Sequence, residues 1–182
     1  RSAPKAPQHS DVENKFLDCN LNDTALTTGW TSLNPTGTGC TDSISVPAQG
    51  DGESERDGRV YYINSVHVKG YIKMAAAESD TGPTGPVFVR IILYWDTQTN
   101  GAEATATDIM DAGGNDDTLA FRNLHNSKRF IVLKDKVVKV APQIVNEGAI
   151  NLFANGPQKV PFQFNKNFSK GIKVRCSATT AN

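Results

Sequence analysis

The clearest pattern in the chain is an alternation of residue types that begins at Val87. Every odd-numbered position from Val87 to Trp95 is apolar, whereas the even-numbered positions include Arg90 and Tyr94. Successive side chains of a strand point to opposite faces of a sheet, so this spacing predicts a strand with one face on the core. The strand ends at Asp96, and apolar, β-branched residues resume only over 130–140. We therefore expect two core strands that bracket a long exposed loop over 96–127.

Weaker patterns predict further strands. Residues 60–74 alternate with their even positions facing inward, except at Asn64 and Gly70, and short strands are expected within 16–21 and 26–33. Half-buried strands are expected over 160–168 and 172–176, a brief apolar run covers 150–153, and the only helical possibilities are 105–110 and 118–123. The expected inner core consists of Val66, Val68, Val87, Val89, Ile91, Leu93, Trp95, Phe162 and Phe164.

Length and composition suit one turn-rich β domain. The 182 residues include 15 Gly and 9 Pro, which break the chain into short segments. No stretch approaches the length of a membrane helix, and the first residues lack the apolar core of a secretion signal. We expect a protein without membrane insertion that is made and kept in a reducing compartment.

The cysteines are few and scattered. Cys19, Cys40 and Cys176 are odd in number, far apart, and without a CxxC pair or nearby histidine. This spacing predicts neither a zinc site nor a disulfide framework. Cys176 alternates with Ile172 and Val174, so we interpret it as a small buried hydrophobe.

Charge is balanced overall but uneven along the chain. Residues 1–120 hold 8 basic and 17 acidic residues, and residues 121–182 hold 11 and 2, so the two parts carry −9 and +9. Such asymmetry indicates a basic surface on one side, or simply solvated strand faces. Six basic residues fall within eighteen positions that contain a single acid, Asp135, and are candidates for contacts with nucleic-acid phosphates. They are Arg122, Lys128, Arg129, Lys134, Lys136 and Lys139; the alternative is a surface turn whose cations pair with acids across an interface.

A second cluster holds carboxylates. Asp111, Asp116 and Asp117 lie within seven residues around a Gly-Gly-Asn turn. Hard oxygen ligands this close would suit Ca²⁺, but the spacing lacks the acidic twelfth position of an EF-hand loop. We favour a solvated acidic loop and expect no metal and no cofactor.

Signatures of catalysis are not found. His9, His67 and His125 occur in three different contexts, none within a HExxH motif or beside a nucleophile signature. The glycine-rich loops lack the phosphate-binding pattern GxxxxGK[ST], and a cupin-like enzyme would need clustered histidine and carboxylate ligands. We therefore expect a protein that is not an enzyme.

Several segments together carry a family resemblance. They read YWDTQTNG at 94–101, FRNL at 121–124, NSKRF at 126–130, AQGDGESERDGR at 48–59 and INSVHVKG at 63–70. Taken together, with the last two upstream of the others, they resemble capsid proteins of circular, Rep-encoding single-stranded DNA viruses, which include circovirus-like and geminivirus-like coat proteins. The matches are spread over most of residues 15–177.

The resemblance implies a fold and a function. The expected fold is an all-β antiparallel jelly roll, a sandwich of two facing four-stranded sheets with Greek-key connections and long loops. Such subunits self-assemble into a small icosahedral (T=1) shell of about sixty copies around a circular single-stranded DNA genome. The resemblance also implies a host-cell receptor or attachment factor, and a location in the virion, with assembly in the host nucleus or cytoplasm.

The two ends of the chain depart from the family pattern. Residues 1–14 read as an arm, of which Arg1 and Lys5 would be the end of a basic, genome-binding segment that lies upstream of this chain. Residues 15–182 would form the jelly roll, and the final strand pair of the family is not found in them. Apart from the resemblance, the pattern of strands equally fits a ligand- or carbohydrate-binding β-sandwich module.

Overall fold

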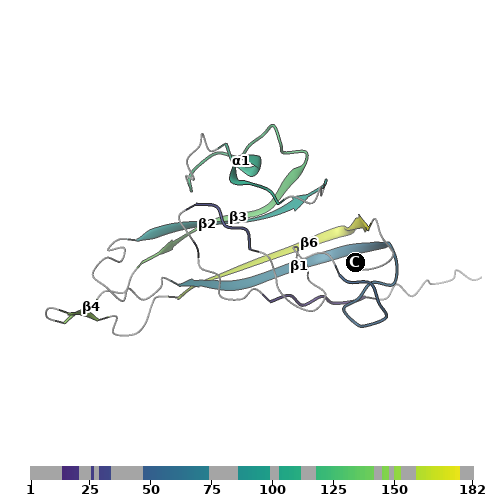
Figure 1. Cartoon of the computed structure of the whole chain (residues 1–182), viewed down its shortest axis with the longest axis horizontal. Helices are drawn as coiled ribbons and strands as arrows, with labels where there is room; N and C mark the ends of the chain where they lie inside the picture. Colours follow the sequence, from purple (N-terminus) through teal and green to yellow (C-terminus); the bar gives the residue numbers. More distant parts are fainter. Residues whose placement is uncertain are drawn as a thin grey trace, which may run out of the picture. The chain divides into compact units, whose positions relative to one another are not determined.

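The described residues of the protein form β-strands in two-stranded pairs together with one short helix (Figure 1). This computed structural model describes residues 14–20, 26, 29–33, 47–73, 86–98, 103–111, 118–141, 145–147, 150–152 and 159–176. In chain order the elements are β1 (Val60–Lys73), β2 (Val87–Asp96), α1 (Ala106–Ile109), β3 (Phe130–Val140), β4 (Val145–Glu147), β5 (Ile150–Leu152) and β6 (Lys159–Arg175). The all-β class expected from the sequence is confirmed for these residues.

The chain divides into two compact units. One comprises Arg1–Thr24, Leu33–Ile63 and Ile172–Asn182, and the other comprises Ala25–Ser32 and Asn64–Gly171. Strands β1 and β6 each pass from one unit into the other, so we describe their pairing within each unit separately. We call the second, larger unit the main unit.

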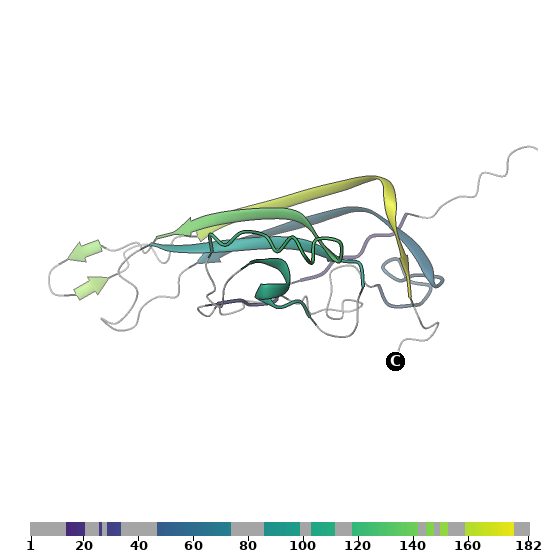
Figure 2. The ribbon, with the colours of Figure 1, turned by 90° about the horizontal axis from the view of Figure 1, so that it is seen from above.

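Strands β2 and β3 form the best-specified pair of the main unit. They run antiparallel, with Val87 opposite Val140 and Asp96 opposite Phe130. A register shift between Leu93 and Tyr94 leaves Leu133 as an extra residue on β3. The observed bounds confirm both predicted strands, because the alternation and the flanking polar residues are local signals. Strands β4 and β5 form a separate antiparallel pair (Figure 2), where a brief apolar run was noted.

The residues between these strands correct the expectation of an exposed loop. Ala104, Ile109 and Met110 are each at most 5 % exposed and form a buried cluster with Phe130. Around it pack Trp30, Ile92, Tyr94, Ala106, Ala120 and Val132. The connection therefore lies on the even-numbered face of β2, and its helix α1 is drawn above β2 and β3 in Figure 1. The described part of the connection thus contributes Ala104, Ile109 and Met110 to the core, although many of its other described residues are exposed.

The predicted inner core is partly wrong for the same reason. Val87 is 40 % exposed, and the other apolar residues of the odd-numbered face of β2 are only half-buried. Alternation identifies two faces but not how far each will be covered. Here the folded-back connection covers part of the mixed face, whereas burial on the odd-numbered face is complete only on β3, at Val138 (6 % exposed) and Val140 (1 % exposed). Of the remaining expected core residues, Phe164 is buried, whereas Val66, Val68 and Phe162 are half-buried.

Strands β1 and β6 lie side by side in Figures 1 and 2. In the main unit His67 contacts Asn165, and Gly70 lies against the ring of Phe162. One residue number rises as the other falls, so the two strands are antiparallel. The two short strands expected over 160–176 are one strand of 17 residues, which contains Gly171 in the left-handed region at φ 65°.

The inward positions of β1 differ in part from the expectation. Val60 and Tyr62 are 45 % and 55 % exposed, although their even numbers predicted burial. Tyr61 and Ile63 are half-buried instead, and the inward positions become even-numbered only from Val66 onward. Two consecutive exposed residues, 64 and 65, separate the two phases, so a single period does not hold along the strand.

The smaller unit holds a tightly bonded turn over 47–58. Arg56 donates to the carbonyl oxygens of Pro47 and Gly58, and the Lys15 ammonium lies 3.1 Å from the Asp57 carboxylate. The backbone N–H of Cys176 donates to the Arg59 carbonyl at 2.8 Å, which joins the start of β1 to the end of β6.

The cysteine chemistry corrects another expectation. Cys19 is disulfide-bonded, whereas Cys176 is a free, half-buried thiol; Cys40 lies outside the described residues. Disulfide formation depends on the distance between Cα atoms, about 4.4–6.8 Å, and sequence separation does not report that distance. The predicted absence of a disulfide is therefore wrong, and Cys176 is only half-buried, although full burial was expected.

Several local predictions can also be judged. Among residues 14–20, 26 and 29–33, only Asn20 makes a bridge, so the strands expected there do not form within the described part. A strand needs a paired neighbour, which a short alternating run cannot supply by itself. The first helical possibility is confirmed by α1, whereas 118–123 forms turns and a bridge from Arg122 to Met110. In the described residues, no helix is long and apolar enough to cross a membrane.

Candidate functional site

The connection between β2 and β3 is fastened to the sheet by Arg90. Its guanidinium donates to both oxygens of Asp135, at 2.9 and 2.7 Å, and to the carbonyl oxygens of Thr118 and Ala120, at 3.2 and 2.6 Å. The side chains of Arg90 and Asp135 are only 13 % and 28 % exposed. Hydrogen bonds from Arg90 lower the pKa of Asp135, and the charge of Arg122 adds to this effect. One side chain thereby links β2, β3 and the connection.

A second ion pair joins the last residue of β2 to the residue before β3. Arg129 donates to both oxygens of Asp96 at 3.1 Å, and its guanidinium lies 4.6 Å from the ring centroid of Phe130. Tyr94 meets the same ring edge-on, with centroids 5.9 Å apart. The hydrogen bond to Asp96 raises the pKa of Arg129, so this cation stays charged.

The helix α1 is held by a capping box and by two asparagines. The Thr105 backbone N–H donates to Asp108 at 2.8 Å, and this bond lowers the pKa of Asp108. Asn123 donates to the Thr107 carbonyl at 2.8 Å, and Asn126 donates to the Asp108 carbonyl at 3.2 Å. These contacts hold residues 118–129 in a defined path across the sheet.

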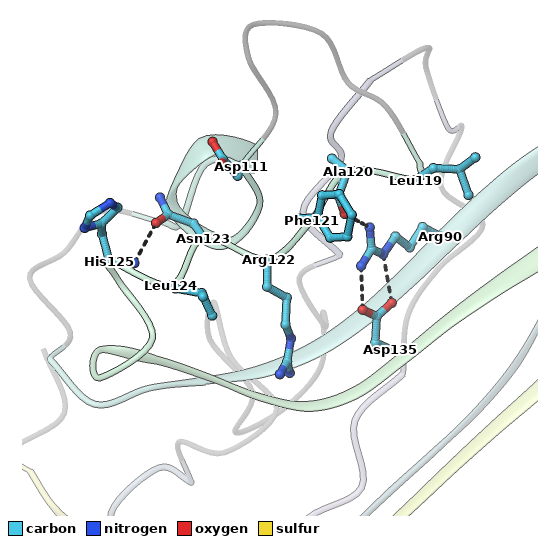
Figure 3. A pocket seen from close by; sticks show the side chains of 10 residues that line it. All are labelled: Arg90, Asp111, Leu119, Ala120, Phe121, Arg122, Asn123, Leu124, His125 and Asp135. Carbon is cyan, nitrogen blue, oxygen red and sulfur yellow. Dashed lines mark hydrogen bonds and ion pairs between the residues drawn. The ribbon is translucent and has the colours of Figure 1, made fainter.

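The fixed path presents three large apolar side chains to solvent. Leu119, Phe121 and Leu124 are 76 %, 86 % and 76 % exposed, and we call them the apolar triad. They line an open depression of about 670 Å³ together with Asp111, Asn123, His125 and the Arg90–Asp135 pair (Figure 3). Large exposed apolar side chains around one depression are more typical of an interaction site than of bare surface. The depression is therefore the candidate functional site.

The structure disperses the basic residues predicted to contact nucleic acid. Lys134 and Lys136 are exposed on the odd-numbered face of the β2–β3 pair, whereas Lys139 is exposed on the even-numbered face. Arg122 donates to the Val132 carbonyl at 3.2 Å, and Lys128 is exposed in the turn before β3. Arg129 is engaged by Asp96. The six do not share one face, and Arg1 and Lys5 lie outside the described residues.

The acidic cluster can be followed only at Asp111. This residue is exposed, and its backbone N–H donates to the Phe121 carbonyl at 2.7 Å. Asp116 and Asp117 lie outside the described residues. Within the described part of the chain, no group of three His, Cys, Asp or Glu side chains is placed to hold a metal ion.

Sequence reasoning missed the two features that define the site. The triad entered only through a possible helix over 118–123 and through the FRNL segment, and Arg90 entered only as an even-numbered position of the predicted strand. A usable signal was the combination of Ala104, Ile109 and Met110 in an otherwise polar segment, because these residues suit burial against a sheet.

Comparison with known proteins provides no family assignment. Neither the family models, the curated proteins nor the solved structures contain a match to this chain. The function must therefore be argued from the residues and their arrangement.

Proposed function

We propose that the protein is a capsid subunit that assembles into a closed shell of about sixty copies around a single-stranded DNA genome. The complete subunit would be an antiparallel jelly roll, to which the antiparallel pairs β2–β3 and β1–β6 would belong. The proposal includes the host-cell attachment factor that the resemblance implies, and it assigns no catalytic role to any residue.

The apolar triad carries the proposal. Its three side chains are more than three-quarters exposed, although the segment that bears them is fixed by the Arg90 and Asn123 hydrogen bonds. Ordered apolar side chains in solvent are unfavourable, and covering each of them contributes about 1.5–3 kcal/mol. A surface of this kind is expected of a subunit whose neighbours cover it in an assembly.

Contacts between the segments that carry the resemblance give further support. Tyr94 and Asp96 come from the first segment, and they contact Phe130 and Arg129 of the third. The FRNL segment supplies Phe121 and Leu124 to the triad. The resemblance thus falls on residues that define one local structure rather than on unrelated turns.

Assembly is tested with a matched pair of variants. Sedimentation velocity and electron microscopy of the purified chain should show closed shells. Phe121→Ser should raise the protein concentration needed for assembly at least tenfold, because it removes about 2 kcal/mol of apolar burial from each contact. Phe16→Ser makes the same change at a side chain that is 81 % exposed in the smaller unit, and it should leave that concentration unchanged. A parent protein that remains a small oligomer at all concentrations would refute the proposal.

The second candidate is a carbohydrate-binding β-sandwich module. An exposed aromatic ring, Phe121, beside the carboxylate of Asp111 and the amide of Asn123 also suits the stacking and hydrogen bonding of a sugar. Ligand-observed NMR with a set of oligosaccharides distinguishes the two. Saturation transfer that disappears in Phe121→Ser, from a protein that forms no shells, would favour this module.

A further inference from the structure

The paired strands β1 and β6 carry many basic side chains and no acidic ones. Over 60–73 and 159–175 the chain contains seven Lys and Arg residues and no Asp or Glu. Five of the seven lie in the main unit, and they are Lys69, Lys73, Lys159, Lys166 and Lys170. The charge becomes concentrated only through pairing, because β1 and β6 are far apart along the chain.

Alternation places most of this charge on one face. His67, Lys69, Tyr71 and Lys73 are exposed on β1, whereas Val66, Val68 and Ile72 between them are half-buried. On β6 the exposed positions include Lys159, Gln163, Asn165 and Asn167. Two contacts show that these positions share a face: His67 Nδ1 lies 3.1 Å from Asn165 Oδ1, and Lys159 Nζ lies 5.0 Å from the Tyr71 ring centroid. We call this surface the basic face.

The chemistry of the basic face matches a single-stranded polynucleotide. Lys69 and Lys73 are about 13 Å apart along β1, so their ammonium groups can follow a phosphate backbone. Tyr71 lies between them and is 47 % exposed, which offers a surface on which a base can stack. Amide side chains at 163, 165 and 167 add hydrogen-bond donors and acceptors for base edges. A base stacked on Tyr71 would displace the Lys159 ammonium from the Tyr71 ring, and this ammonium could then contact the adjacent phosphate.

We infer that the basic face binds single-stranded nucleic acid through phosphate contacts from Lys69 and Lys159 and base stacking on Tyr71. The inference rests on the proposed function in one respect: the capsid proposal identifies the single-stranded nucleic acid as DNA. It assigns binding to a different surface from the β3 lysines, Lys134 and Lys136, which flank the acid Asp135.

Binding is measured by fluorescence anisotropy of a labelled oligothymidylate over a salt series, with the full 182-residue chain kept unassembled at low concentration. Lys69→Gln/Lys159→Gln should reduce the slope of log K against log salt by about 1.4, because each lost phosphate contact removes about 0.7. Tyr71→Leu should weaken binding at least fivefold while leaving the slope unchanged. Lys69→Arg/Lys159→Arg retains both charges and should restore the parent slope.

The matched control is Lys134→Gln/Lys136→Gln, which makes the same charge change on β3. An unchanged slope in this control supports the inference, whereas an equal or larger reduction overturns it. A heparin fragment serves as a polyanion without bases. If it binds as tightly as the oligonucleotide and Tyr71→Leu affects neither ligand, the surface attracts any polyanion and the inference is wrong.

Failure of the inference is separable from failure of the proposed function. Shell formation with no slope change in Lys69→Gln/Lys159→Gln would refute only the basic face as the binding surface. The expected slope change in a protein that forms no shells would refute only the capsid proposal.

Discussion

Removing the guanidinium of Arg90 should detach the connection between β2 and β3 from the sheet. Arg90→Met keeps the apolar stem of the side chain but deletes four hydrogen bonds, two to Asp135 and two to backbone carbonyls. Hydrogen bonds to charged groups contribute about 1.5–3 kcal/mol and neutral ones about 1. Water can reach the partly exposed carboxylate, so we expect a loss of about 2–4 kcal/mol in the free energy of unfolding.

A double-mutant cycle isolates the ion pair from this total. Asp135→Leu should also destabilise the protein, and the double variant with Arg90→Met should lose less than the sum of the two single changes. The coupling free energy should be about 1–2 kcal/mol, because each single variant leaves a partly buried charge without its partner. The assay is urea unfolding of unassembled protein, followed by the fluorescence of Trp95 and Trp30.

The pH dependence provides an independent check. Arg90 lowers the pKa of Asp135 from its ordinary value of 3.8, so the folded state favours the ionised carboxylate. This stability is present above pH 3.8 and is lost as the pH falls through the lower pKa of the folded state. The stability difference between the parent and Asp135→Asn should therefore shrink in acid. The control is Lys134→Met, which changes an exposed side chain on the same strand. An equal loss in the free energy of unfolding from Lys134→Met and Arg90→Met would refute the reasoning.

Two further predictions concern β1. Gly70→Ala should destabilise the β1–β6 pair by about 1–3 kcal/mol, since the added Cβ would lie 2.7 Å from the Phe162 ring, and Phe162→Leu should restore part of the loss in thermal unfolding. Equal midpoints for Gly70→Ala and the parent would contradict this packing. Burial raises the pKa of Tyr61 from 10.0 to about 12, so its phenol should ionise late in an ultraviolet titration and Tyr61→Phe should reduce the late absorbance change. Burial also raises the pKa of Tyr94, so part of the late change should remain in this variant. The stability that comes from the neutral Tyr61 phenol is fully present below pH 10 and is lost as the pH rises through 12. A titration in which Tyr61→Phe removes an early step would contradict the raised pKa of Tyr61.

The sequence alone determined the elements whose signals are local. The bounds of β2 follow from alternation that ends at the polar Asp96, and those of β3 follow from the apolar, β-branched run over 130–140, because both signals lie in the residues of the strand itself. The short helix α1 follows from Thr105 and Asp108, whose capping box spans only four residues. The all-β class follows from the same local periods.

Only the tertiary structure decided which faces are covered and which residues meet. Alternation is symmetrical between the two faces of β2, so the burial of Tyr94 depends on a connection that folds back over the even-numbered face. The basic face likewise depends on β1 pairing with a strand almost a hundred residues away, as the contact between His67 and Asn165 illustrates. Gly70 appeared in the sequence as a gap in the pattern, and its reason is the ring of Phe162 on the neighbouring strand. Non-local pairing carries no periodic signal, which is why these features were beyond prediction from the sequence.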